Sequence, residues 1–229
     1  MTRWVALETS TWWGGVALLE EADGGPVVIA EAGLRAGGSH AFHLLALLDL
    51  LLVEAGWVKT SVDGYAATRG PGSFTGVRVG LGTIRGLALG SGRPCLGVGT
   101  LDAFAEAFGP AEADRVPLLD AGRGEVYGAR FDPASSPPVV LAGSWVGPPE
   151  RALEGGGAKP VIFGPGAEAH RKRLAAAGWQ GPVRRSPTSV AAATGRLALD
   201  RLAAGAVSGE GMSPVYLRPP DAELKRHKP

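Results

Sequence analysis

The sequence predicts an α/β protein whose two halves share one order of secondary-structure elements. Segments typical of short strands alternate with segments of helical periodicity, and the order strand, strand, strand, helix, strand, helix occurs twice. With 229 residues, the chain is long enough for one large or two small domains that bury a real core.

The first half begins with strands joined by short turns. Strands are expected at Trp4–Glu8, Gly15–Leu19, Pro26–Ala32, Tyr65–Thr68 and Pro94–Val98. The first turn is expected at Trp12–Gly14. The second is expected at Asp23–Gly25, because its sequence DGG is typical of hairpins.

The first long helix is expected at Ser39–Ala55, where Ser39 is a good N-cap and Gly56 ends the helix. Its clearly polar residues are His40, His43, Asp49 and Glu54. A helix that is apolar nearly all round needs cover on more than one side. Because one sheet face covers a single stripe, the remaining leucines imply a second layer or another subunit.

The segment 69–90 dominates the functional interpretation, and its sequence is RGPGSFTGVRVGLGTIRGLALG. A helix is expected from its N-cap Ser73 onward, because Val77, Leu81, Ile84 and Ala88 recur at helical spacing. The interior glycines are Gly76, Gly80, Gly82 and Gly86, and Gly90 is expected to end the helix. Interior glycines cost on the order of 3–4 kcal/mol here relative to alanine, so a close neighbour is needed to explain them.

On a helical projection, the glycines share one arc of about 160° with Val79, Thr83 and Leu87. Such a face admits either a closely packed helix or a phosphate group. A phosphate would use only the amides of the first turn, whereas the glycines continue along the helix, so the pattern favours helix packing. Arg78 and Arg85 point to the other side, either as a solvated edge or as contacts with a partner.

The second half repeats the pattern after a helix at Leu101–Phe108. Its expected strands and helices are Val116–Ala121, Glu125–Phe131, Val139–Val146, Pro149–Leu153 (helix), Val161–Phe163, Ala167–Ala177 (helix) and Ser189–Ala204 (helix, capped near 186–188). We place one domain at 1–99, joined by the C-terminal segment 206–229, and the other at 100–205. The duplicated βββαβα order is typical of the actin-like (ASKHA, RNase H-like) fold, in which two related domains face each other across a cleft.

Charge, hydropathy and cysteine content restrict the class of protein. The formal net charge is +1, and no dense basic run precedes the C-terminal LKRHKP, whereas a protein that holds nucleic acid alone usually has a stronger basic footprint. No stretch reaches the ~20 apolar residues of a membrane span, and the N-terminus reads as a strand, not as a signal peptide. Cys95 is the only cysteine, so we expect a reducing, cytoplasmic compartment.

Three strand-to-turn segments are weak candidates for a nucleotide site. Their candidate residues are Glu8, Asp120, Gly122 and Gly164. A P-loop is excluded because no lysine lies near Gly70–Gly76, and the glycine spacing there does not fit GxGxxG. Trp12 and Trp13 would crowd a phosphate at the first turn. Plain turns explain each segment too, so together they indicate the ancestry of the fold more than present catalysis.

Metal binding and nucleophilic catalysis find little support. His40 and His43 could share an ion, but zinc needs three or four ligands and no third is evident. A hydrogen bond from such a histidine to a neighbouring subunit is the alternative. Ser73 lacks the flanking glycines of a nucleophile elbow, so a helix cap is its better role. We expect no metal and no catalytic residue.

Three segments resemble signature segments of the TsaB family, also called YeaZ. They are RGPGSFTGVRVGLGTIRGLALG at 69–90, DAGRGEVYGARF at 120–131 and PVYLR at 214–218. The segments VALETST, SHAFHLL and GVGTLDAF are similar at lower stringency, so the resemblance covers nearly the whole chain. The resemblance implies a two-domain actin-like fold.

The resemblance also implies a function in tRNA modification. It implies a non-catalytic partner of TsaD, the transferase that adds threonylcarbamoyl to the adenosine beside the anticodon, with the ATPase TsaE as a further partner. It implies a homodimer when the subunit is alone, tRNA contact through the complex, and no cofactor, with ATP or ADP bound only in the complex. Glu8 departs from the family's usual aspartate and the tryptophan pair is unusual, which argues against autonomous nucleotide binding.

We predict that the helices 39–55 and 73–89 pair side by side and present a shared surface to TsaD or to a second copy. The residues predicted for this surface are His40, His43, Leu44, Leu47, Leu48, Leu51, Gly76, Val79, Gly80, Thr83 and Leu87. The alternative function is an autonomous actin-like ATPase or kinase; no catalytic constellation supports a glycoprotease-type peptidase. The basic tail Lys225–Lys228 either contacts tRNA or is a solvated end.

Overall fold

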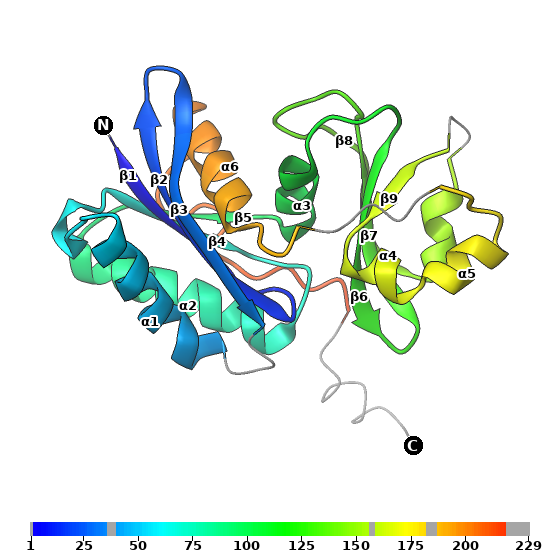
Figure 1. The fold of residues 1–229 in the computed structure, drawn as a ribbon, viewed down its shortest axis with the longest axis horizontal. Coiled ribbons are helices and arrows are strands. Elements are labelled where there is room, and N and C mark those ends of the chain that lie inside the picture. Colours follow the sequence, from blue (N-terminus) through cyan, green and yellow to red (C-terminus); the bar gives the residue numbers. More distant parts are fainter. Residues whose placement is uncertain (1, 36–39, 156–158, 182–186, 219–229) are drawn as a thin grey trace.

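Two β-sheets lie next to each other in the computed structural model, with helices packed around them (Figure 1). The structure describes residues 2–35, 40–155, 159–181 and 187–218. Among these residues, no helix is both long and apolar enough to cross a bilayer.

The first sheet has the strand order β3-β2-β1-β4-β5. Its strands are β1 (Arg3–Glu8), β2 (Trp13–Ala22), β3 (Gly25–Arg35), β4 (Gly64–Thr68) and β5 (Cys95–Val98). β1 pairs antiparallel with β2 and parallel with β4, so the central strand is covered along both edges. All five predicted strands are confirmed. However, β2 already begins at Trp13, which pairs with Arg35, so the turn predicted at Trp12–Gly14 lies earlier in the chain.

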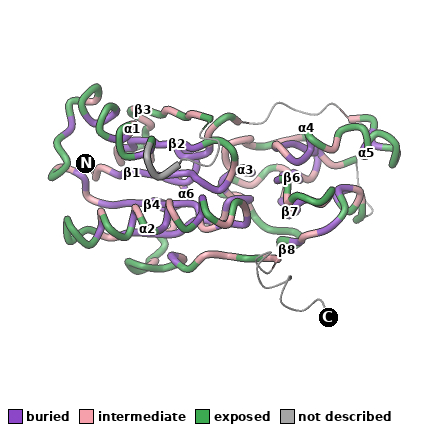
Figure 2. Tube along the Cα trace, turned by 90° about the horizontal axis from the view of Figure 1, so that it is seen from below, coloured by how far each residue is buried: buried purple, intermediate pink, exposed green. Residues whose placement is uncertain are grey.

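Residues of β1 alternate between two hydrophobic clusters on opposite faces of this sheet, as strand geometry requires. Val5 and Leu7 face the helices α1 (His40–Glu54) and α2 (Phe74–Ser91). Trp4 and Ala6 belong to the cluster on the other face, and Figure 2 shows β1 buried along most of its length. α1 and α2 contact each other, which confirms that the two helices pair. The N-cap predicted at Ser39 lies outside the described residues.

The opposite face of the first sheet is covered by α6 (Ala191–Ala203), which contacts β1, β2 and β4. α6 thus packs on the first sheet although it follows the second sheet in sequence, and the domain ranges 1–99 with 206–229, and 100–205, stay predictions. The prediction of a cap near 186–188 is wrong for the described residues 187 and 188, because Val190 occupies the N-cap position of α6. Glu31 Oε1 of β3 accepts a hydrogen bond from Ala192 N at 3.0 Å and satisfies this helix end from another element.

The second sheet has the order β8-β7-β6-β9. Its elements are β6 (Arg115–Gly122), β7 (Glu125–Phe131), β8 (Val140–Gly147), the 3₁₀ helix Pro149–Leu153, β9 (Val161–Phe163), α4 (Pro165–Ala169) and α5 (Arg171–Ala176). α3 (Thr100–Phe108) contacts β6 and β7 of this sheet and also α6. The helix predicted at Ala167–Ala177 is divided in two, because the backbone of His170 leaves helical values (φ −106°, ψ 18°).

Residues 207–218, which we call the C-terminal strap, return along the first sheet and end at the second. Gly97 N of β5 donates to Glu210 O at 2.9 Å, and Val215 N donates to Arg69 O at 2.7 Å. At the end of the strap, Arg218 Nη1 donates to Ala121 O of β6 at 2.9 Å. The strap therefore connects both sheets.

Candidate functional site

The ends of α2 are set by one polar cap and one glycine. Ser73 Oγ accepts a hydrogen bond from Gly76 N at 3.2 Å, which confirms the predicted N-cap. The predicted end at Gly90 is wrong, because the helix continues to Ser91 and Gly92 is its C-cap with φ 66°. A left-handed residue at this position favours glycine, so the helix ends where the first positive φ occurs.

Two glycines of α2 are explained by a close approach within the chain. A Cβ on Gly76 would lie 2.0 Å from the carbonyl oxygen of Thr9, and one on Gly80 would lie 2.2 Å from Thr9 Oγ1. Both glycines are buried. The first part of the glycine face therefore packs against the turn that follows β1, and not against α1.

Three other glycines have no such explanation. A Cβ on Gly82, Gly86 or Gly90 would have no heavy atom of another described part of the chain within 4 Å, and all three residues are exposed. Each interior glycine costs about 1 kcal/mol relative to alanine in a helix. Packing within the described part of the chain therefore does not require these three glycines.

α1 divides its apolar residues between the core and the surface. Leu44, Leu48 and Leu51, which were predicted for a partner surface, are buried in the core under the helix pair. The side chains left outside are Leu45 (46% exposed), Leu50 (53%) and Val53 (74%). The sequence does not distinguish these three residues, because the helix is apolar nearly all round and hydrophobic periodicity therefore does not mark its outer face.

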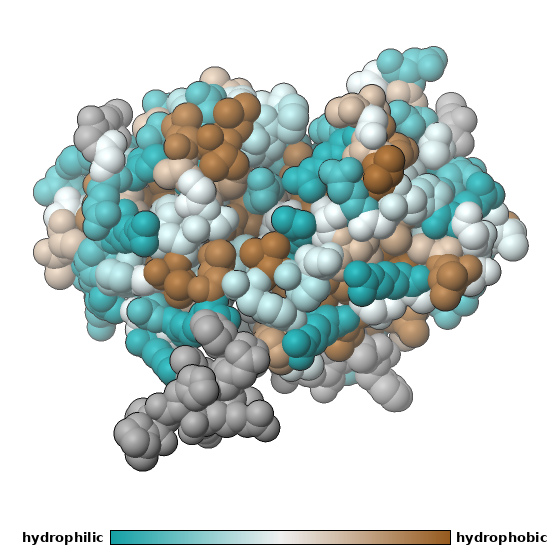
Figure 3. Space-filling model, turned by 180° about the vertical axis from the view of Figure 1, so that it is seen from behind, coloured by the Kyte–Doolittle hydropathy of each residue, from teal (hydrophilic) through white to brown (hydrophobic). Residues whose placement is uncertain are grey.

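We define the helix-pair surface as a set of exposed and half-buried residues, mostly apolar, on α1 and α2; Asp49, Glu54, Arg78 and Arg85 are also exposed on these helices and are not counted in it. Its members are His43, Leu45, Leu47, Leu50, Val53, Val79, Gly82, Thr83, Gly86, Leu87, Leu89 and Gly90. Leu89 is 87% exposed. The side chain of His40 lies outside what the structure describes. On the face seen from behind, apolar side chains lie in separate patches among polar ones (Figure 3).

Glu8 closes its own turn at the end of β1. Its Oε1 accepts hydrogen bonds from Ser10 N at 2.6 Å and from Thr11 N at 3.1 Å. Burial raises the pKa of the Glu8 carboxyl to about 8 from the usual 4.5, although these hydrogen bonds act in the opposite direction. Glu8 thus occupies the turn amides that a phosphate would need.

Hydroxyl groups fill the space beside this turn. Ser10 Oγ donates to Thr68 Oγ1 at 2.7 Å, and Thr100 Oγ1 donates to Ser10 Oγ at 2.9 Å. This buried chain links β1, β4 and the start of α3. Trp12 is 65% exposed and Trp13 is 38% exposed, so neither side chain packs into the turn.

The other nucleotide-site candidates lie in the second sheet and its connections. Asp120 Oδ1 accepts a hydrogen bond from Gly122 N at 2.8 Å in an exposed turn. Gly164 is buried at the start of α4, where a Cβ would lie 2.5 Å from Leu118 O. Glu8 is thus buried in the turn after β1 of the first sheet, whereas Asp120, Gly122 and Gly164 lie on or beside β6 of the second sheet.

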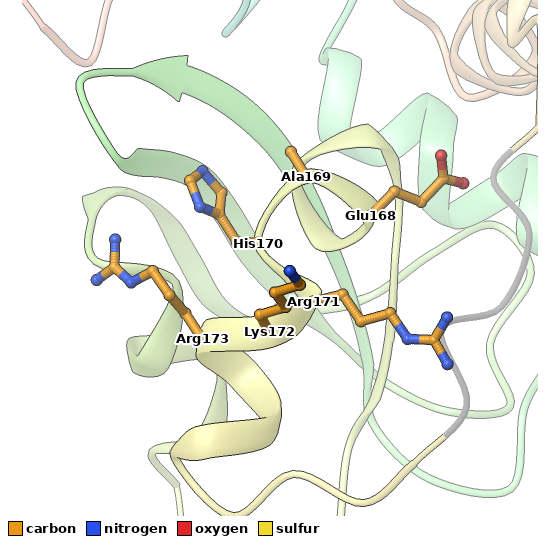
Figure 4. A pocket seen from close by; sticks show the side chains of 6 residues that line it. All are labelled: Glu168, Ala169, His170, Arg171, Lys172 and Arg173. Carbon is orange, nitrogen blue, oxygen red and sulfur yellow. The ribbon is translucent and has the colours of Figure 1, made fainter.

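A hollow of about 480 Å³ lies beside α5 and is lined by residues 168–173 (Figure 4). The side chains of His170, Arg171, Lys172 and Arg173 point in different directions, as Figure 4 shows. Arg173 is held by Glu150, with an Nη2 to Oε2 distance of 2.8 Å. Because the basic groups diverge, the hollow has no converging set of donors for one ligand. Among the described residues, no three His, Cys, Asp or Glu side chains are grouped so that they could hold a metal ion.

The fold is similar to that of YeaZ from Pseudomonas aeruginosa, a solved structure that superimposes with a TM-score of 0.76 at 32% identity over 95% of this chain and 100% of that chain. A family model described as TsaD, tRNA N6-adenosine threonylcarbamoyltransferase, matches residues 34–176. This places the chain in the class of TsaD-related α/β proteins with two sheets.

Within that class, the curated relatives carry a more specific name. The chain is 41% identical over 125 residues to the tRNA threonylcarbamoyladenosine biosynthesis protein TsaB of Haemophilus influenzae, an alignment that covers 54% of this chain and 51% of that protein. It is 43% identical over 94 residues to the protein of the same name from Escherichia coli, covering 40% of this chain and 41% of that protein. The chain thus spans about half the length of these relatives or less. It belongs to the TsaB (YeaZ) family.

Proposed function

We propose that this chain is the non-catalytic subunit that docks on a TsaD-type transferase and is required for threonylcarbamoyl modification of the adenosine beside the anticodon in tRNAs. Family membership supports the pathway, since the curated relatives are named for threonylcarbamoyladenosine biosynthesis in tRNA. The turn of Glu8, closed by its own carboxylate, supports a subunit without a nucleotide site of its own.

The observation that carries the proposal is the helix-pair surface. Exposed glycines let a partner backbone approach α2 closely, and the aliphatic side chains beside them provide the apolar centre typical of protein interfaces. Large exposed apolar residues gathered on one helix pair are unusual for a surface that faces only water. A second copy would use the same surface when the transferase is absent.

The proposal includes an actin-like fold with duplicated domains, a cytoplasmic complex with a TsaE-type ATPase, and tRNA bound through that complex. Docking would favour the competent conformation of the transferase, which requires only that the subunit bind that conformation more tightly. The chain holds no cofactor in this proposal, and ATP or ADP would bind only in the complex.

The test is docking to the TsaD protein of the same organism, measured by calorimetry and by reconstituted modification of tRNA. We expect Gly86→Arg and Leu50→Asp each to weaken docking by about thirtyfold or more, because central interface residues contribute roughly 2 kcal/mol or more. Gly143→Arg and Leu141→Asp on β8 are matched controls, since both positions are also exposed and distant from the helix pair in sequence. If the α1 and α2 variants dock and modify tRNA like the wild type, the surface is not the interface.

A further inference from the structure

A second surface, at the start of α2, carries exposed aromatic side chains next to arginine. We call it the aromatic edge; its residues are Trp12, Trp13, Phe74, Arg78 and Tyr216. Three segments meet there, because Ser73 N donates to Ser10 O and Val215 N donates to Arg69 O, both at 2.7 Å. Figure 1 shows the β1–β2 turn, the start of α2 and the end of the strap at the same side of the molecule.

Two of the aromatic rings on this edge, Phe74 and Tyr216, pack against each other and against Arg78. The ring centroids of Phe74 and Tyr216 are 5.0 Å apart, and the guanidinium carbon of Arg78 lies 3.7 Å from the Phe74 centroid. Tyr216 is 37% exposed, and Trp12 is more exposed still. Only 7% of the residues in the chain are aromatic, so four on one edge are a concentration that core packing does not explain.

The charge of this edge is positive. Arg78 is exposed, whereas Arg69 is half-buried and its guanidinium lies beside Gly211 of the strap. Arg218 forms an ion pair with Glu125, and the carboxylate of Glu8 is buried in its own turn. At this edge an exposed cation, Arg78, therefore stands next to exposed rings.

We propose that the aromatic edge binds RNA at unpaired bases. The rings would stack on bases, which every base permits because each has a π-face, and Arg78 would neutralise a neighbouring phosphate. A protein partner would also use Trp, Tyr and Arg. RNA fits better, because the exposed charge of the edge is the cation of Arg78, and three of the four exposed leucines among the described residues (Leu45, Leu50 and Leu89, but not Leu141) lie on the helix-pair surface. That this RNA is tRNA rests on the proposed function.

The experiment measures binding of the full chain, alone and with its TsaD partner, to labelled RNA by fluorescence anisotropy. The probes are a hairpin RNA with an unpaired loop and a fully paired RNA duplex of the same length. We expect tighter binding of the hairpin, and a loss of about tenfold in affinity for Tyr216→Ala and for Trp12→Ala. Tyr216→Phe keeps the ring and should bind like the wild type, which separates stacking from a folding defect.

Salt dependence tests the role of arginine separately. Arg78→Gln should reduce the slope of log affinity against log salt concentration by about 0.7–0.9, the value of one phosphate contact, whereas Tyr216→Ala should leave the slope unchanged. Arg171→Gln on α5 is the matched control for an exposed arginine and should change neither affinity nor slope.

Three outcomes overturn the proposal. Equal binding of hairpin and duplex, with Tyr216→Ala unaffected, excludes stacking. A loss of RNA affinity for Arg171→Gln without such a loss for Arg78→Gln would place the RNA-binding surface at α5. A loss of TsaD docking for Tyr216→Ala in the absence of RNA assigns the edge to a protein partner. Gly86→Arg should block docking and leave RNA binding by the isolated chain intact, so a failure of the proposed docking function remains distinguishable.

Discussion

Alanine substitution of the glycines in α2 should have opposite effects on stability at the two kinds of position. Gly82→Ala and Gly86→Ala meet no atom within 4 Å, so each should raise the free energy of unfolding by the helix-propensity difference of about 1 kcal/mol. For a chain of this size, that corresponds to about 2–4 °C in Tm for each substitution. Thermal and urea unfolding measure it.

Gly76→Ala should instead lower the stability. Its Cβ would lie 2.0 Å from the backbone carbonyl of Thr9, which cannot rotate away as a side chain can. Overpacking of this kind costs about 1–3 kcal/mol and exceeds the gain in helix propensity. A stability of Gly76→Ala at or above that of the wild type would refute the close-approach argument. The argument would also be refuted if both Gly82→Ala and Gly86→Ala lowered the free energy of unfolding.

The same variants also test why the exposed glycines are there. If Gly82 and Gly86 admit a partner backbone, the double alanine variant should be more stable than the wild type and yet dock more weakly on TsaD. Gly143→Ala on β8 is the control for an exposed glycine outside α2. Unchanged docking by the stabilised double variant would leave the glycines without an interface role.

Other predictions concern the turn of Glu8, the cap of α2 and nucleotide binding. The pKa of Glu8 in the folded state is raised to about 8 from 4.5. The contribution of Glu8 to the free energy of unfolding is therefore full below pH 4.5 and falls as the pH rises towards 8. The steepest fall is about 1.4 kcal/mol per pH unit. Glu8→Gln should flatten this part of the stability–pH profile, whereas exposed Glu54→Gln should not; equal profiles would contradict it. Ser73→Ala should cost about 1 kcal/mol in urea unfolding and Ser73→Asp much less, since the cap accepts the hydrogen bond from Gly76 N; equal losses would exclude capping. Calorimetry with ATP and Mg²⁺ should give no micromolar binding to the isolated chain, and binding that Asp120→Ala abolishes would favour the ATPase alternative.

Local signals in the sequence predicted the elements well. Turn residues and periodicity placed β4, β5, β7 and β9 within one residue at either end, because strand and helix boundaries depend on nearby residues. Ser73 was recognisable as a cap for the same reason. The pairing of α1 with α2 followed from their composition, since neither helix could bury its apolar residues alone.

What the sequence could not show depends on neighbours distant along the chain. Periodicity placed Gly76 and Gly80 on one face of α2, but only the fold shows that Thr9 lies against that face. It likewise could not separate buried Leu44 from exposed Leu45 in a helix that is apolar all round. The return of α6 to the first sheet is a property of topology, which no local pattern encodes.

The hydrophobic cluster behind the first sheet has a mechanical consequence. It includes Trp4 and Ala6 of β1, continues through Phe104 of α3 and reaches Phe131 and Phe163 of the second sheet without interruption. Separating the sheets about a hinge would expose these rings to water, at about 25 cal/mol for each Å² of apolar surface. The two sheets should therefore move together as one rigid unit. A displacement imposed by a partner at one sheet would then be transmitted to the other sheet.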